Sequence, residues 1–156
     1  MPYISRKDLQ LTQEELDEYV RSNQWGRLAT ASLDAQPHVA PLGYVFHDGE
    51  IWFHALRASR RGRHLAENPK VAFLIDDGVA PGDSYTQRRG VIIYGRCYVA
   101  NDDPRMEAAR QAFMRAFGME RVDQVQRRTH DWCRVEIDRI SSWDFRKIPA
   151  GADRKA

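Results

Sequence analysis

The sequence has little of several features that reveal a function early. Its 24 Lys and Arg residues against 22 Asp and Glu leave a formal net charge of +2, without the strong basic excess of dedicated nucleic-acid domains. No apolar run approaches the length that spans a bilayer, and residues 1–7 contain no signal-like hydrophobic stretch. We therefore expect a cytoplasmic protein that binds neither nucleic acid nor membrane. Only two cysteines are present, and we expect Cys97 and Cys133, in apolar strand-like segments, to be buried thiols.

The motifs that identify many enzymes and metal sites are absent as well. The chain has no Gly-x-Ser-x-Gly, no Walker-type phosphate loop and no dinucleotide glycine fingerprint. Its five histidines are scattered, and His130 with Cys133 is the one closely spaced pair with metal-ligating chemistry. One pair is too few for a zinc site. The sequence therefore predicts no resident metal and points to no catalytic side chain.

What the sequence does contain is a series of short apolar segments separated by turn-forming residues. A length of 156 residues with 42% hydrophobic residues is enough for one packed domain, which we expect over residues 1–149, followed by a flexible polar tail at 150–156. Turns at short intervals favour an antiparallel barrel over a doubly wound sheet. We expect a mainly β fold with added helices, in which six strands cover residues 25–32, 37–46, 50–56, 71–75, 90–100 and 134–145.

Helical signals interrupt the strands at three places. Thr12 and Glu15 form a capping box at the start of a first helix that runs to about residue 22. A second, short helix covers residues 59–67 and ends before an Asn-Pro pair. A third begins at Asp103, as the cap, with proline at its first position, and ends before a glycine. The loop 76–87 is long for a hairpin, which makes it a candidate for function.

The start of the second helix carries the main chemical signal. Ser59 is placed as the N-cap, and Arg60 and Arg61 follow in the first turn. Because a helix start already carries partial positive charge, both arginines are repelled by it unless an anion neutralises them. A phosphate at this point accepts hydrogen bonds from free backbone amides, from the Ser59 hydroxyl and from both guanidinium groups. The alternative is a solvated basic surface, which is what runs of charge usually are.

The strand expected at residues 37–46 has an unusual composition. Its section 38–43 contains both a proline and a glycine, residues that mark a bulge, an edge or a close approach of another group. A flat ring lying against exposed backbone accounts for such a strand. An ordinary edge strand accounts for it equally well.

Four segments follow one another with the order and spacing of a known family. They are WGRLAT at 25–30, QPHVAPL at 36–42, WFHA at 52–55 and SRRGRHLAENPKV at 59–71. In combination they resemble the pyridoxamine 5'-phosphate oxidase-like, FMN-binding split-barrel family, over about residues 12–100. The resemblance implies a six-stranded antiparallel split β-barrel that forms a homodimer, with FMN bound at the subunit interface.

The resemblance also implies a set of cofactor-binding residues. The backbone of Val39, Ala40, Pro41 and Leu42 would face the isoalloxazine ring, and His54 and Ala55 would line it. Arg60 and Arg61, with Ser59, would hold the ribityl phosphate; the family's usual Arg-Lys pair is Arg-Arg here, which keeps the charge. The same comparison suggests Gln87 and Arg89, and it suggests that Trp143 approaches the cofactor of the neighbouring subunit.

The C-terminal segment departs from the enzyme that gives the family its name. Residues 140–149 show no match to the segment with which that oxidase grips its substrate, so the sequence does not support oxidation of pyridoxamine phosphate. Shorter members of the superfamily resemble flavin reductases or deazaflavin-dependent reductases. A deazaflavin coenzyme carries an extended anionic chain, and Arg57 and Arg63 are the residues available for it.

Two functions of different classes follow from these observations. The first is an oxidoreductase that passes a hydride between reduced flavin, or deazaflavin, and a small organic substrate, with the protein supplying binding and orientation. The second is a non-catalytic flavin-binding or sensor protein that uses the same pocket. Binding of RNA or DNA through residues 57–64 is disfavoured by the small net charge.

Overall fold

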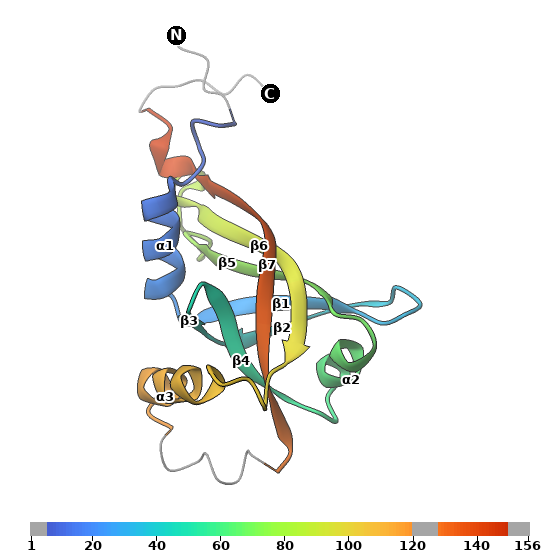
Figure 1. The fold of residues 1–156 in the computed structure, drawn as a ribbon. Coiled ribbons are helices and arrows are strands. Elements are labelled where there is room, and N and C mark those ends of the chain that lie inside the picture. Colours follow the sequence, from blue (N-terminus) through green and yellow to red (C-terminus); the bar gives the residue numbers. More distant parts are fainter. Residues whose placement is uncertain (1–5, 120–127, 150–156) are drawn as a thin grey trace.

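A computed structural model describes residues 6–119 and 128–149, and the expected tail at 150–156 lies outside the described residues. Within that part the fold is a seven-stranded sheet with three α-helices and two short 3-10 helices (Figure 1). In chain order the elements are α1 Gln13–Ser22, β1 Trp25–Ala31, β2 Pro37–Gly43, β3 Val45–His47, β4 Glu50–Leu56, α2 Arg60–Glu67, β5 Lys70–Asp77, η1 Tyr85–Gln87, β6 Arg89–Val99, α3 Met106–Phe117, β7 His130–Asp144 and η2 Phe145–Lys147.

All paired strands of the sheet are antiparallel, in the order β2-β1-β5-β6-β7-β4-β3. The two outermost strands of this order, β2 and β3, are consecutive in the chain and are separated by a single residue, Tyr44. The sheet therefore curls round until its two ends belong to one stretch of chain (Figure 1). This confirms the mainly β split-barrel class, although the strand count is seven instead of the expected six.

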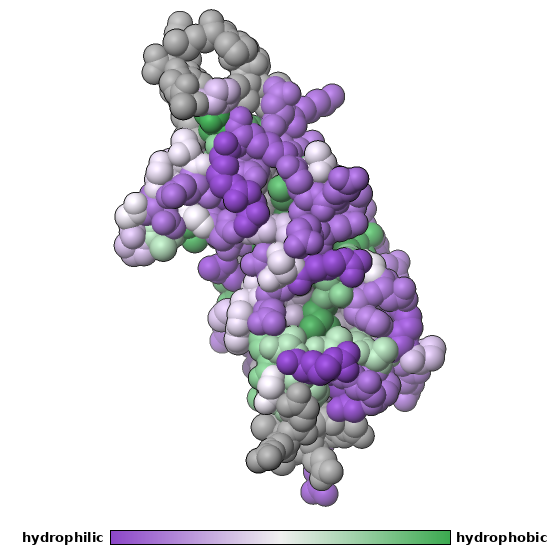
Figure 2. Space-filling model, turned by 90° about the vertical axis from the view of Figure 1, so that its left-hand side faces the viewer, coloured by the Kyte–Doolittle hydropathy of each residue, from purple (hydrophilic) through white to green (hydrophobic). Residues whose placement is uncertain are grey.

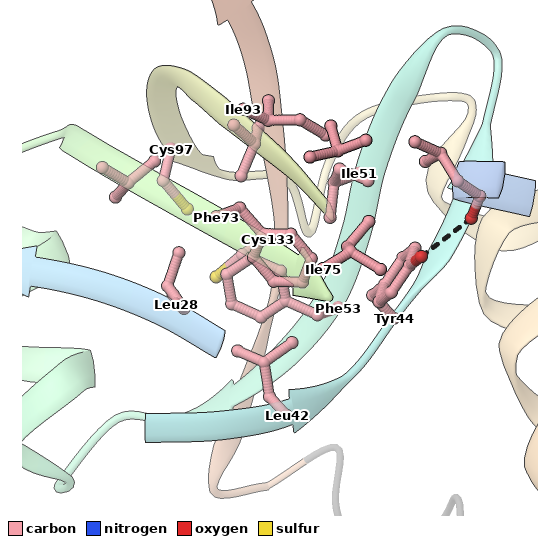
Figure 3. Close-up of a cluster of buried hydrophobic side chains, with 14 of the residues drawn as sticks. Leu28, Leu42, Tyr44, Ile51, Phe53, Phe73, Ile75, Ile93, Cys97 and Cys133 are labelled. Carbon is pink, nitrogen blue, oxygen red and sulfur yellow. Dashed lines mark hydrogen bonds between the residues drawn. The ribbon is translucent and has the colours of Figure 1, made fainter. Parts of the chain in front are cut away.

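The additional strand arises because the single strand expected at residues 37–46 is interrupted at Tyr44. The Tyr44 side chain is fully buried, and its hydroxyl donates to the Val20 carbonyl oxygen at 2.8 Å (Figure 3). Its backbone N–H donates to the carbonyl oxygen of Gln24, outside the ladder. Tyr44 thus ties the strand to the end of α1, and the chain changes direction there.

The third helix also begins later than the sequence predicts. Its first residue is Met106, and its N-cap is Arg105, which makes no side-chain capping bond. Asp103 instead accepts from the Arg105 backbone N–H and pairs with the Arg105 guanidinium at 3.0 Å. The Asp103-Pro104 sequence therefore forms a turn before the helix. Strand β7 differs as well, since it begins at His130, four residues before the expected start.

The main hydrophobic core lies inside the curled sheet, beneath α1. The predicted capping box at Thr12 is present, and Leu16, Tyr19 and Val20 form the buried stripe of α1. Cys97 and Cys133 are buried free thiols whose sulfurs point into this core (Figure 3). The face of the molecule that carries α1 and α3 is hydrophilic over its upper part and has a hydrophobic patch in its lower part (Figure 2). Among the described residues, no helix is both long enough and apolar enough to cross a membrane.

The β1–β2 turn contains a strained residue that gives a first prediction. Ala35 has φ 63°, in the left-handed region that favours glycine. We expect Ala35→Gly to raise the free energy of unfolding by about 0.5–1 kcal/mol, because relief of the backbone strain exceeds the extra entropy of an unfolded glycine. Urea unfolding measures the change. The control Ala66→Gly, in helix α2, should lower stability by about 1 kcal/mol, and a loss in both variants would contradict the strain argument.

Candidate functional site

The start of α2 has the geometry that the sequence predicts. Ser59 is the N-cap, with φ −69° and ψ 161°, and its hydroxyl oxygen accepts from the Gly62 N–H at 3.0 Å. The same hydroxyl donates to the Leu56 carbonyl oxygen at 2.6 Å, which joins the cap to the end of β4. No acidic residue lies in the first turn. The helix start thus presents backbone amides and two arginines without an acidic side chain of its own.

Helix α2 lies against β1, β2 and β4, and three contacts with β1 and the end of β4 hold it in place. A Cβ on Gly62 would lie 2.5 Å from the Arg57 carbonyl oxygen, so only glycine allows this close approach of helix and strand end. His64 is buried, and its Nδ1 lies 3.1 Å from the Thr30 hydroxyl of β1. Asn68, the C-cap, donates from its side chain to the Ala31 carbonyl oxygen at 3.2 Å. The helix is therefore held at both ends.

Arg60 and Arg61 differ in their surroundings. Arg60 is exposed, whereas Arg61 is partly buried and its Nε, shielded from solvent, has no hydrogen-bond partner among the described residues. Burial lowers the pKa of Arg61, partly offset by the sulfurs of Cys133 and Cys97. No carboxylate of residues 6–119 or 128–149 forms an ion pair with either arginine. A partly desolvated guanidinium without a counter-charge is costly, which an incoming anion would relieve.

The two neighbouring arginines are already engaged within the protein. Arg57 pairs with Asp131 at 2.7 Å and donates to the Arg128 carbonyl oxygen at 3.0 Å. Arg63 donates to the Ala58 carbonyl oxygen at 2.6 Å. The Arg57 pair with Asp131 fastens the connection between β4 and α2 to β7, and the Arg63 bond joins α2 to that connection. The structure thus separates Arg57 and Arg63, which hold the backbone, from the Arg60–Arg61 pair.

Strand β2, which contains the residues expected beneath a flavin ring, is an edge strand of the described sheet and pairs there with β1. Its side chains alternate: Val39 and Pro41 are exposed, Ala40 is half-buried and Leu42 belongs to the core. Every second residue of an edge strand directs its backbone N–H and C=O away from the sheet. Val39 to Leu42 therefore combine a solvated apolar face with free backbone groups.

His54 and Ala55 are adjacent on β4 and face opposite sides of the sheet, as successive strand residues must. Ala55 is buried in the main core. The His54 ring packs edge-to-face on Phe113 of α3 at 5.0 Å and on Trp132 of β7 at 5.5 Å. Their two side chains therefore do not line one surface.

Gln87, Arg89 and Trp143 lie far from the start of α2 in the same chain. Arg89 pairs with Asp77 at the end of β5 that is remote from α2, and at about 3.3 Å per residue β5 spans about 23 Å. Gln87 caps the 3-10 helix η1 by accepting from the Ser84 N–H. The ring of Trp143 covers Gly90. The sequence-predicted residues thus do not all lie together. Ser59, Arg60 and Arg61 begin α2, the His54 side chain packs on α3, and Gln87, Arg89 and Trp143 lie at the end of β5 and β6 that is remote from α2.

One member of the α2 group was not predicted from the sequence. His38 stands opposite Thr30 in the β1–β2 register, and its ring lies 5.9 Å from that of His64. Desolvation lowers the pKa of His38, and the charges of Arg60, His64 and Arg61 lower it further. Only the strand register brings His38 beside α2, and local sequence patterns carry no signal for it.

Comparison with known proteins gives matches of three kinds. Residues 12–144 match a family model described as pyridoxamine 5'-phosphate oxidase. A 5a,11a-dehydrotetracycline/5a,11a-dehydrooxytetracycline reductase from Streptomyces rimosus is 34% identical over 88 residues, which are 54% of this chain and 60% of that reductase. A conserved hypothetical protein from Mycobacterium tuberculosis shares the fold with a TM-score of 0.78 at 27% identity, covering 99% of this chain and 96% of its own. A FAD-binding protein from Mesorhizobium loti has a TM-score of 0.68 at 22% identity, and the match covers 85% of this chain and 93% of that protein.

Proposed function

The chain belongs to the pyridoxamine 5'-phosphate oxidase family, and on that premise we propose that it is an FMN-binding oxidoreductase that transfers a hydride between reduced flavin and a small organic substrate. The observation that carries the proposal is the partly buried Arg61, whose Nε has no partner among the described residues, beside Arg60 at a capped helix start. A phosphate monoester supplies the missing counter-charge and acceptors.

The residues at α2 fit the phosphate end of FMN. The first-turn amides offer neutral donors, and Arg60 and Arg61 offer charged ones. The Ser59 hydroxyl positions the helix start and already donates its one proton to the Leu56 carbonyl oxygen. The exposed, apolar edge formed by Val39 and Pro41 supplies a surface for a flat ring. When bound, FMN supplies the hydride chemistry, and the protein binds and orients it and excludes water.

We propose that a second copy of the chain completes the site. Gln87, Arg89 and Trp143 of one copy lie too far from its own α2 to share a ligand with it, whereas a homodimer can place them beside the α2 of the other copy. Trp25, Val39 and Val99 leave 63%, 63% and 57% of their surface exposed, and an interface would cover such residues. Sedimentation with and without FMN measures the oligomeric state.

FMN is favoured over a deazaflavin coenzyme because Arg57 and Arg63 are occupied by Asp131 and by backbone carbonyl groups. An extended anionic tail would have to displace these bonds. The reductase from Streptomyces rimosus, identical at 34% over its aligned part, supports reduction of an organic substrate as the reaction. We propose a cytoplasmic enzyme of this kind, with its substrate a small organic molecule.

Titration of the purified protein with FMN, riboflavin and a deazaflavin coenzyme tests the proposal. FMN should bind with a shifted flavin spectrum. Riboflavin, which lacks the phosphate, should bind at least 100-fold more weakly, because it loses two charge-assisted hydrogen bonds that contribute about 1.5–3 kcal/mol each. If the protein binds neither FMN nor the deazaflavin coenzyme, the proposal is overturned. Turnover with a reductant and a panel of acceptors separates the enzyme from a non-catalytic flavin-binding protein, which would not reoxidise bound flavin faster than free flavin.

A further inference from the structure

His38 and His64 lie beside the arginine pair on the side of the sheet that α2 covers. Thr30 links them, because it stands opposite His38 in the β1–β2 register and bonds to Nδ1 of His64. The two imidazole rings meet edge-to-face at 5.9 Å. His38 is half-buried and stays accessible, whereas His64 is 7% exposed. Two elements, β2 and α2, thus bring a pair of titratable rings together.

The charges around His38 are almost all positive. From α2, Arg60, Arg61 and His64 act on it, and β1 contributes the neutral Thr30. Asp34, in the exposed β1–β2 turn, is a carboxylate that interacts electrostatically with His64, and its pKa is lowered mainly by the Ser32 hydroxyl. Asp34 therefore stays ionised and contributes a charge that does not change near neutral pH. Protonation of His38 would add a further positive charge to a cluster that already lacks counter-charges.

We propose that His38 is a further binding residue of the anion site at α2, and that it takes up a proton when a doubly charged anion such as a phosphate monoester binds. The inference rests on the proposed function, because it concerns the same site. A dianion beside Arg60 and Arg61 reverses the local field, so that the protonated ring becomes the favoured form. The imidazolium then donates a charge-assisted hydrogen bond to the anion.

The direction of the pH dependence follows from linkage. In the free protein the pKa of His38 lies below its ordinary value, whereas a bound dianion raises it. Affinity for the anion therefore increases as pH falls through the raised pKa of the complex, and levels off below the lowered pKa of the free protein. Each unit between the two pKa values corresponds to a tenfold change in affinity.

Sulfate is the suitable probe, because it stays doubly charged from pH 8.0 to 5.5 while a phosphate monoester changes its own charge there. Its dissociation constant can be measured by calorimetry, or by competition with FMN. We expect sulfate to bind about tenfold more tightly at pH 5.5 than at pH 8.0, a difference of one pKa unit. His38→Gln should reduce that ratio to less than about twofold, because glutamine takes up no proton. Sulfate should still bind, since Thr30, His64 and both arginines remain. His47→Gln, on β3, is the matched control and should keep the wild-type ratio.

Two results separate this inference from the proposed function. If FMN binds the wild type but the sulfate ratio is the same in His38→Gln, the role of His38 is refuted and the cofactor site stands. If FMN binds at no pH, the proposed function fails and this inference with it. Calorimetry in buffers of different ionisation enthalpy gives an independent readout. Proton uptake on sulfate binding near pH 6.5 in the wild type, absent in His38→Gln, supports the proposal, and equal uptake in both contradicts it.

Discussion

Replacing Arg60 and Arg61 together by alanine is expected to weaken FMN binding by a factor of about 10² to 10⁴. Each charge-assisted hydrogen bond to a phosphate contributes about 1.5–3 kcal/mol, and the double variant removes at least two. The Ser59 cap and the first-turn amides remain in the double variant, so the helix start is kept while its two positive charges are removed. Fluorescence quenching on titration with FMN measures the affinity.

Removing the Arg61 guanidinium is expected to weaken FMN binding but not to destabilise the cofactor-free protein. The Nε of Arg61 is buried without a partner among the described residues, and burial lowers its pKa, so the side chain costs free energy in the folded state. Arg61→Met keeps the aliphatic stem and removes the unsatisfied group, which is worth about 1–3 kcal/mol. Unfolding of the free protein should therefore require as much urea as the wild type, or more.

The control for the affinity measurement is a pair of arginines on other helices. Arg21→Ala combined with Arg115→Ala, on α1 and α3, removes the same net charge away from α2 and should leave FMN affinity within about twofold, because distant surface charges are screened. Unchanged FMN affinity in the Arg60–Arg61 variant would refute the phosphate assignment. A strong loss of stability in Arg61→Met would instead identify Arg61 as a structural residue.

Local features of the fold could be predicted from the sequence because neighbouring residues determine them. The capping box at Thr12 and the serine cap at Ser59 are bonds between residues three apart, and both are present. Strand β4 has the expected bounds, since an Asp-Gly turn precedes it and charged residues follow. Where one interaction between residues a few positions apart decides the local structure, the sequence pattern is sufficient to predict it.

The errors arose where contacts distant in sequence decide the structure. Tyr44 interrupts an otherwise continuous strand because its hydroxyl bonds to Val20 of α1 and its N–H to Gln24, just after α1, both some twenty residues earlier. Asp103 has the composition of a helix cap, but its carboxylate is drawn to Arg105 and Arg134, and the side-chain bond to Arg105 lowers its pKa to about 2. The Arg134 partner lies on β7 and is not visible in the local pattern. Arg105 is only two residues away, and its pairing with Asp103 competes with the cap that the sequence predicts.

In the candidate site, too, the residues close in sequence could be predicted to lie together, whereas those brought in by distant contacts could not. Ser59, Arg60 and Arg61 are contiguous, and one capping argument placed them together. His38 joins them only through the pairing of β1 with β2, and strand register is set by the whole sheet. The position of Gln87, Arg89 and Trp143 at the other end of the molecule likewise depends on the direction of β5 and β6.

Gly62 connects the fold to the site, because α2 approaches the end of β4 at this residue. Alanine normally favours a helix over glycine by about 1 kcal/mol, so helix propensity alone predicts that Gly62→Ala is stabilising. The added Cβ, however, would lie 2.5 Å from the Arg57 carbonyl oxygen and closer still to that of Leu56. Both atoms are backbone, so the helix must move. Overpacking of this kind costs about 1–3 kcal/mol, which exceeds the gain.

We therefore expect Gly62→Ala to lower the free energy of unfolding by about 1–2 kcal/mol, the net of overpacking and propensity. FMN affinity should fall by about 10- to 100-fold, because a displacement near 1 Å moves the Ser59 cap and Arg60 out of hydrogen-bond range. Urea unfolding and FMN titration measure the two effects. Ala66→Gly, which weakens the same helix by propensity alone, should lose a similar stability with little change in affinity. Equal losses of affinity in both variants would show that general weakening of α2, and not its displacement, governs the site.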